Sequence, residues 1–330
     1  MRGHRLHALA AALVIVSAAA SLPLVTSSSF SDVTANGGNS ISALPDWTAP
    51  TVTAVTIAKT AGGSAGFIKK SGTYYVYATA TDTGAPASGI NTVRANVGTV
   101  TTGQTAVPLV AGSYSAGGVS YSYRSAQLTA MSTLPAGALT FSVSATDRAG
   151  ASASANSSVT GDNTVPSASA IQATNVAGGT AGRPEIGDTL TLTYSEVMDW
   201  TSILAGWNGT ATDVQLALVN GGSSSDYIQV YSSGQVQLPL GTVYLNRTDL
   251  LGGSSGSYVT FGPTGIGTPT RMTASGSAIS MVLGTPSGAV GTASSAAAMT
   301  WTPSTVATDR AGNATSATTR SESGTSDRDF

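Results

Sequence analysis

Apolar and polar residues alternate along several stretches of this chain, with the period of two that a strand with one buried face requires. In residues 139–145 every second residue is apolar, and Thr or Ser stands between them. Residues 190–194 alternate with threonine in the same way. Residues 73–81 form a third such run. Its first face carries Tyr74, Val76, Ala78 and Ala80, and its second carries Tyr75 and Tyr77. The pattern predicts antiparallel sheets.

Clusters of small, turn-forming residues separate these runs. They lie at residues 61–64, 111–113, 220–222 and 252–254. Such spacing is typical of the hairpins of β-sandwiches. No long helical pattern appears after the first thirty residues, so we expect an all-β protein.

Two short phrases occur twice. Asp-x-Thr-x-Pro stands at residues 46–50 and 162–166, and Ala-Thr-Asp-Arg-Ala-Gly stands at residues 145–150 and 307–312. A repeat of this kind indicates a duplicated domain, opened by the first phrase and closed by the second. We expect the second phrase to end the penultimate strand of each domain, with its Asp and Gly in the following turn. The second domain is the longer one.

The N-terminus has Arg2 and Arg5 followed by an apolar stretch and small residues, which is the layout of a secretory signal peptide. Cleavage after Ala20 and cleavage near Ser29 both fit. An uncleaved anchor is the alternative, but Pro23 and the serine-rich end weigh against it. We therefore expect a secreted, extracellular or surface-associated protein with no membrane segment after cleavage. The expected organisation is a signal peptide at 1–29, a mature N-terminal segment at 30–45, domains at 46–161 and 162–321, and a polar tail at 322–330.

Composition excludes several kinds of catalytic and metal-binding site. Charged residues make up 9% of the chain and hydrophobic residues 41%, which favours packed β domains over disorder. His4 and His7 are the only histidines, and there is no cysteine. The mature chain therefore lacks the imidazole or thiolate of a Ser-His-Asp triad, a Cys-His pair or an ordinary zinc site. The net charge is -2 with scattered basic residues, so nucleic acid is not an expected partner.

The stretch from Asp46-Trp-Thr-Ala-Pro to Ala-Thr-Asp-Arg-Ala-Gly resembles a bacterial Ig-like domain of surface and secreted proteins. The second domain, with Gly187-Asp-Thr-Leu-Thr-Leu-Thr-Tyr-Ser-Glu-Val-Met-Asp199, is similar to the Ig-like domains of S-layer proteins. The resemblance implies two tandem Ig-like antiparallel β-sandwiches. It is specific for fold and says little about function.

A third resemblance lies in residues 30–43, which resemble the segment after the signal peptide in camelysin and TasA type matrix proteins. In that family export uses a dedicated signal peptidase, and some members assemble into extracellular fibres. The globular domain of that family is not evident in this chain. The resemblance therefore bears on the export route more than on assembly.

Five carboxylates of the second domain are the nearest approach to catalytic chemistry: Glu185, Asp188, Glu196, Asp199 and Asp213. A glycosidase needs only two. Glycoside hydrolysis with carboxylates alone and weak calcium ligation are both open, but Asp at strand ends more commonly caps turns. The same turn chemistry is expected of Asp147 and Asp309, with Arg148 and Arg310 solvated or paired. We predict no enzyme activity, and no catalytic, cofactor-binding or metal-ligating residue.

Trp200 and Trp207 bracket a predicted loop, and exposed indole rings can stack on sugars. They are the candidate glycan contacts, although core packing is the more common use of tryptophan in an aromatic-poor chain.

The function expected from these observations is that of a non-catalytic structural or adhesive protein of the bacterial extracellular layer or matrix. An edge strand could recruit a strand from another copy, with Phe30, Val33 and Ile41 on the candidate donor strand. Self-association and cell-wall polysaccharide are the expected partners. A carbohydrate-binding module is the first alternative and a carboxylate-only glycoside hydrolase the second.

Overall fold

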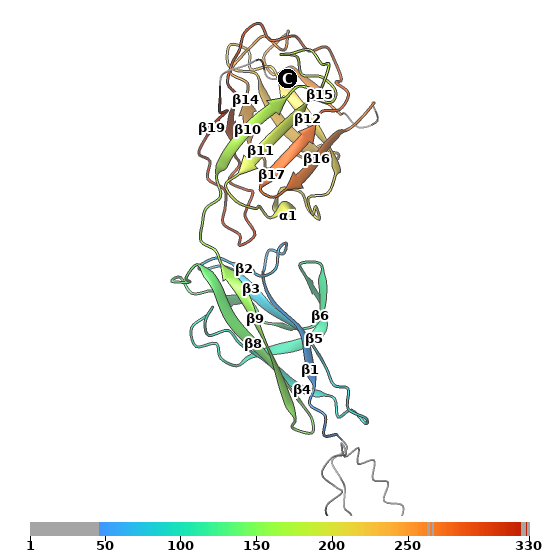
Figure 1. The fold of residues 1–330 in the computed structure, drawn as a ribbon, viewed down its shortest axis with the longest axis vertical. Coiled ribbons are helices and arrows are strands. Elements are labelled where there is room, and N and C mark those ends of the chain that lie inside the picture. The colour runs from blue at the N-terminus through green and yellow to red at the C-terminus, as the bar shows by residue number, and fades with distance from the viewer. Residues whose placement is uncertain (1–45, 263–264, 266, 325–327, 329–330) are drawn as a thin grey trace, which may run out of the picture. The chain divides into compact units, whose positions relative to one another are not determined.

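The computed structural model describes residues 46–262, 265, 267–324 and 328. The alternating runs form strands that gather into two sheets, and among these residues no ladder joins a strand of one sheet to a strand of the other (Figure 1). The fold is all-β and sandwich- or barrel-like, as the alternation predicted. The one helix of the described residues, α1 (Trp200–Ile203), is a single turn, and none of these residues forms a helix long and apolar enough to cross a bilayer.

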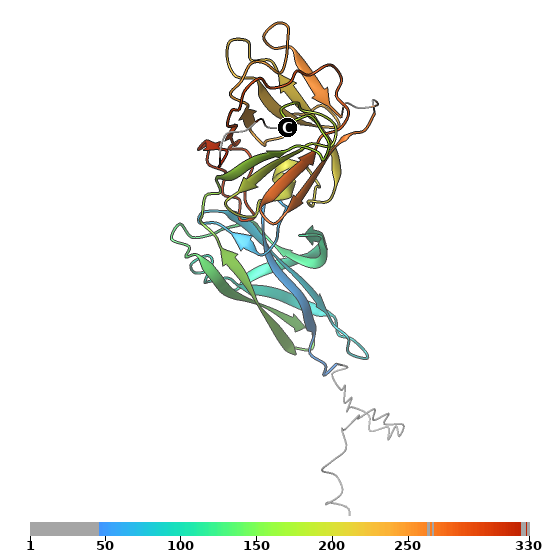
Figure 2. The same cartoon turned by 45° about the horizontal axis from the view of Figure 1, so that its top comes forward.

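The first sheet has nine strands in the order β1-β3-β6-β5-β4-β8-β9-β2, with β7 also paired to β3. All its ladders are antiparallel except the short parallel pair of β2 and β9. Figure 2 shows the β8–β9 hairpin lying alongside β1, where the hydroxyl of Ser157 donates to the carbonyl of Val55 at 3.2 Å. The strands are β1 (Thr51–Lys59), β2 (Phe67–Ile68), β3 (Thr73–Thr81), β4 (Ile90–Asn96), β5 (Val107–Ala116), β6 (Val119–Ser125), β7 (Leu128–Thr129), β8 (Gly137–Asp147) and β9 (Ser152–Gly161).

The two faces of β3 separate as the sequence predicted. Its first face is buried in the main core of the first sheet, which holds Tyr74, Val76, Ala78 and Ala80. On the opposite face Tyr77 packs against Tyr121 in a smaller cluster, with ring centroids 5.4 Å apart.

The second sheet has ten strands in the order β10-β11-β17-β16-β12-β13-β14-β18-β19, with β15 also paired to β12. One edge of β12 is shared, because residues 212–214 pair with β16 and residues 216–219 pair with β15. The strands are β10 (Ala168–Thr174), β11 (Thr189–Tyr194), β12 (Thr212–Val219), β13 (Tyr227–Ser232), β14 (Thr242–Tyr244), β15 (Tyr258–Phe261), β16 (Thr270–Ser275), β17 (Ala278–Val282), β18 (Thr300–Thr302) and β19 (Arg320–Ser321).

An aromatic pair lies in the core of the second sheet. The rings of Tyr194 and Trp301 meet edge to face with centroids 4.9 Å apart, and both side chains are almost fully buried. Trp301 donates its indole N–H to the carbonyl of Leu240 at 2.7 Å. The Tyr194 hydroxyl has no partner, and burial raises the pKa of this phenol far above its usual range.

Two local expectations were wrong. The cluster at residues 111–113 lies inside β5, where the ladder with β6 shifts register between Ala111 and Tyr114, so these residues form a bulge and not a turn. The phrase at 145–150 does end β8, but its second copy at 307–312 closes no regular strand. It makes only isolated bridges, including one between Met198 and Asp309.

The predicted boundary between residues 161 and 162 falls between β9, the last strand of the first sheet, and β10, the first strand of the second. The signal peptide at 1–29 and the segment at 30–45, with the candidate donor residues Phe30, Val33 and Ile41, lie outside the described residues.

Candidate functional site: the junction between the two sheets

A buried ion pair links the two sheets. Lys59 ends β1, and its Nζ lies 2.5 Å from Oδ2 of Asp199, with the two side chains 8% and 4% exposed. The same Nζ donates to the carbonyl of Asp309 at 3.1 Å. Asp199 also caps α1 by accepting the N–H of Thr201 at 3.1 Å. A buried charge needs such partners, because desolvation without them costs several kcal/mol.

The second copy of the repeated phrase supplies further contacts to the first sheet. Lys69 donates its Nζ to the carbonyl of Gly312 at 2.6 Å. The guanidinium carbon of Arg310 lies 3.9 Å from the ring centroid of Phe67, a cation–π distance. Lys59 and Lys69 are two of the three lysines in the whole chain; Lys59 forms an ion pair with Asp199, and Lys69 donates to a backbone carbonyl of the second copy of the phrase.

A group of three carboxylates lies at this junction. Asp162, Glu196 and Asp309 place one oxygen each within 4.8 Å of one another. Burial raises the pKa of Glu196 to about 7, the charges of Asp162 and Asp309 add to the rise, and Arg310 opposes it. Glu196 therefore keeps its proton to a higher pH than an ordinary carboxyl does.

Asn313 donates hydrogen bonds to two residues of this group. Its backbone N–H and its Nδ2 donate to the two carboxylate oxygens of Asp309, each at 2.7 Å. Its Nδ2 also donates to the backbone carbonyl of Asp162 at 3.0 Å. Asn313 thus provides a donor for each carboxylate oxygen of Asp309, while Oε1 of Glu196 is buried without a hydrogen-bond partner.

A second group of three carboxylates lies in the first sheet alone. Asp46, Asp82 and Asp147 place one oxygen each within 4.8 Å of one another. Asp46 and Asp147 belong to the two repeated phrases, so the first copies of these phrases meet in space. Sequence reasoning missed this convergence because the three residues lie far apart in the chain.

The five carboxylates singled out from the sequence do not assemble. Neither group of three contains two of them among the described residues. Asp188 accepts the N–H groups of Val176 and Glu185, each at 2.8 Å, which is the expected turn chemistry. Asp213 forms an exposed pair with Arg271.

The two tryptophans pack against each other and against the core of the second sheet. Trp207 is 5% exposed and donates its indole N–H to the carbonyl of Thr210 at 2.6 Å. Trp200 is partly buried, and the ring centroids lie 5.7 Å apart. A sugar needs an open ring face, so this burial gives the predicted glycan contact no support.

Tyrosines line a more open depression on the second sheet. It has a volume of about 400 Å³ and lies over β12, β13 and β15. Tyr258 is 66% exposed at its rim, and the hydroxyl of Tyr231 donates to Gln229 at 2.9 Å. Other lining residues are Gln215, Ala217, Val219, Gln235 and Thr260. Aromatic faces beside amides and hydroxyls are groups that can contact a sugar.

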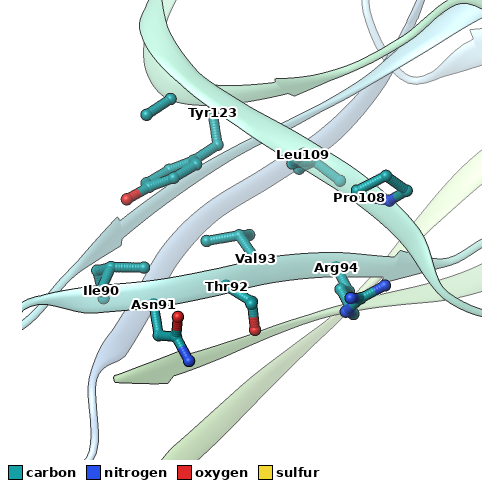
Figure 3. A pocket seen from close by; sticks show the side chains of 9 residues that line it. Ile90, Asn91, Thr92, Val93, Arg94, Pro108, Leu109 and Tyr123 are labelled. Carbon is teal, nitrogen blue, oxygen red and sulfur yellow. The ribbon is translucent and has the colours of Figure 1, made fainter. Parts of the chain in front are cut away.

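The first sheet opens between β4 and β5. Their ladder spans only Val93–Ala95, so residues 90–92 pair with β8 on one edge and are not paired with β5 on the other. A depression of about 240 Å³ marks this opening, and Figure 3 shows Tyr123 on one side of it with Ile90 and Val93 on the other.

No protein-family model matches the chain, and no curated protein matches it. The function is therefore inferred from the chemistry of these residues alone.

Proposed function

We propose that the chain is a non-catalytic structural or adhesive protein of a bacterial extracellular layer, secreted or displayed on the cell surface, with two bacterial Ig-like domains. The observation that carries this proposal is the junction, where the buried pair of Lys59 and Asp199 joins the two sheets. A load-carrying or presenting protein needs such a fixed connection between its domains. Relative domain motion is otherwise the default for a small interface.

The state of the carboxylates supports a non-catalytic role. Glycoside hydrolysis by carboxylates alone needs two carboxyl groups that face a common substrate. Asp199 is committed to Lys59, and Asp188 to backbone N–H groups. Glu196, which has the pKa of a general acid, lies beside Asp309, whose oxygens accept hydrogen bonds from Asn313.

Self-association would use the opening between β4 and β5. A strand added along residues 90–92 could bond to the backbone edge that β5 leaves, and Tyr123 would cover one of its side chains. The candidate donor is the segment 30–43 of another copy, with Phe30, Val33 and Ile41 as the residues that would fill the depression.

Electron microscopy of the secreted protein, alone and with cell-wall polysaccharide, tests this proposal. We expect the wild type to form assemblies or to decorate cell walls. Removal of residues 30–43, and Asn91→Lys at the opening, should each reduce self-assembly, because an edge lysine discourages strand addition. Inert monomers in the wild type, together with hydrolysis of a cell-wall glycan, would contradict the proposal.

A carbohydrate-binding function is the second candidate, and the tyrosine-lined depression favours it. Tyr258→Ala should then abolish retention on a glycan array, while Tyr244→Ala, at a tyrosine that is 41% exposed outside the depression, should not. Equal binding by the two variants would remove this candidate.

A further inference from the structure

Three strand ends of the first sheet bring their carboxylates together. Asp46 precedes β1, Asp82 follows β3, and Asp147 is the last residue of β8. Asp147 is 0% exposed and Asp46 is 4% exposed. One oxygen of each residue lies within 4.8 Å of the others, close enough for all three to enter one coordination sphere of a cation.

Backbone N–H groups hold two of these carboxylates in place. Asp46 accepts from Thr48 at 2.9 Å and from Ser88 at 2.8 Å, and these bonds are the main reason why its pKa is lowered. Asp82 accepts from Gly89 at 2.6 Å. Each bond uses one lone pair of a carboxylate oxygen and leaves another available for a ligand.

Asp147 is the unexplained member of the group. Its Oδ1 accepts the N–H of Ala151 at 2.8 Å, but its Oδ2 is buried and has no hydrogen-bond partner. No lysine or arginine forms an ion pair with any of the three carboxylates among the described residues. Three carboxylates with a buried, unpartnered oxygen are costly unless another positive group compensates them.

The second copy of the phrase has a side-chain hydrogen-bond donor that the first copy lacks. Asp309 occupies the position of Asp147, and the residue four positions later is Asn313 in place of Ala151. The Nδ2 of Asn313 donates to Oδ2 of Asp309 at 2.7 Å. Ala151 has no such donor, so the corresponding oxygen of Asp147 is left without a partner.

We propose that Asp46, Asp82 and Oδ2 of Asp147 bind a divalent cation of the calcium type. Hard carboxylate oxygens suit Ca²⁺, which takes about 6–8 oxygen ligands in flexible geometry, so water would complete its shell. Mg²⁺ demands a near-octahedral arrangement and should bind less tightly. The cation would tie the residues that lead into β1 to the ends of β3 and β8. This inference goes beyond the proposed function and stands without it.

Calcium titration of the full-length secreted protein tests the site. We expect millimolar CaCl₂ to raise the melting temperature by about 5 °C over a chelator-treated sample, since a ligand specific for the native state stabilises it. MgCl₂ should give a smaller shift. Tb³⁺ should bind at the same site and luminesce on excitation of tryptophan, because Trp47 is 81% exposed and adjoins Asp46.

Ala151→Asn is the decisive variant, because it supplies the amide that the second repeat already has. It should weaken calcium binding at least tenfold while the apoprotein remains folded. Asp147→Asn should abolish calcium binding. Asp213→Asn, which changes an exposed carboxylate outside the group, should leave calcium binding unchanged. No calcium response in the wild type, or an undiminished response in Ala151→Asn, would overturn the proposal.

Discussion

Single residues set the chemistry of the two carboxylate groups. In the group of Asp162, Glu196 and Asp309 the amide of Asn313 donates to Oδ2 of Asp309, whereas in the group of Asp46, Asp82 and Asp147 the corresponding Oδ2 of Asp147 has no donor. The sequence difference behind this contrast includes the change from Asn313 to Ala151 at equivalent positions. One side-chain amide thus accounts for the different surroundings of the two equivalent aspartates.

Replacement of Tyr194 by Phe should keep or raise stability. The hydroxyl of Tyr194 is buried without a hydrogen bond, so its removal ends a desolvation cost while the edge-to-face contact with Trp301 remains. We expect the free energy of unfolding, measured by denaturant titration, to rise by up to about 1 kcal/mol. A loss of more than about 1 kcal/mol would show that the hydroxyl has a partner.

Glu196→Gln should flatten the pH dependence of stability. Burial, aided by Asp162 and Asp309 and opposed by Arg310, raises the pKa of Glu196 from its ordinary value of 4.5 to about 7. The contribution of protonated Glu196 to the free energy of unfolding is fully present below pH 4.5 and is lost as the pH rises through 7. The reason is that the unfolded chain releases this proton at a lower pH than the folded chain does.

Urea titrations between pH 5 and pH 8 with chelator present provide the measurement. The wild type should lose stability toward pH 8 by more than Glu196→Gln does, since the amide stays neutral throughout this range. The same pH slope in both proteins would contradict the elevated pKa.

At the scale of elements, the β1–β2 loop is shaped by the junction. Gly62 and Gly63 both have positive φ, at 79° and 81°. A Cβ on Gly63 would overlap the carboxylate of Asp199, whereas a Cβ on Gly62 would meet nothing within 4 Å. Both positions therefore favour glycine because of the positive φ, and Gly63 also does so because a Cβ there would overlap Asp199.

Gly63→Ala should destabilise the protein more than Gly62→Ala. Both variants pay for a left-handed residue, about 1–2 kcal/mol, and Gly63→Ala should cost about 1–3 kcal/mol more because it displaces Asp199. Denaturant titration of the two variants side by side isolates the overlap, since the backbone term is common to both. Equal losses would mean that Asp199 moves aside freely.

The repeated phrases show how an element can have the same local structure and different tertiary roles. In both copies the Asp accepts the N–H of the residue four positions later, at 2.8 Å for Asp147 and 2.7 Å for Asp309. This turn chemistry was predictable from the sequence. The first copy faces Asp46 and Asp82, and the second contacts Lys59, Lys69 and Phe67.

At the scale of the whole molecule, the buried pair of Lys59 and Asp199 should couple the two sheets. Lys59→Met leaves Asp199 buried without its cation, which costs about 3–5 kcal/mol. We expect calorimetry to resolve two unfolding transitions in this variant where the wild type shows one.

Lys70→Met is the matched control, because Lys70 is exposed and forms none of the described ion pairs. It should unfold like the wild type. Two transitions in the wild type itself, or a single transition in Lys59→Met, would show that the pair does not couple the sheets.

The sequence by itself determined the class of fold. Alternation in residues 73–81 predicted the bounds of β3 and both of its faces, because strand periodicity is a local property of the chain. The phrases at 46–50, 145–150 and 162–166 likewise marked ends of strands, whereas the copy at 307–312 did not. The bulge at 111–113 escaped prediction because its small residues fit a turn equally well, and only the ladder with β6 decided between the two.

Only the tertiary structure decided which side chains meet. Spacing in the sequence carries no information on the meeting of Asp46, Asp82 and Asp147, nor on the burial of Lys59 against Asp199, since these contacts form across separate strand ends. The tertiary structure also buries Trp207, where the sequence allowed an exposed sugar platform. Local pattern fixes strands through backbone geometry, whereas charge pairing and burial depend on distances that exist only after the sheets close.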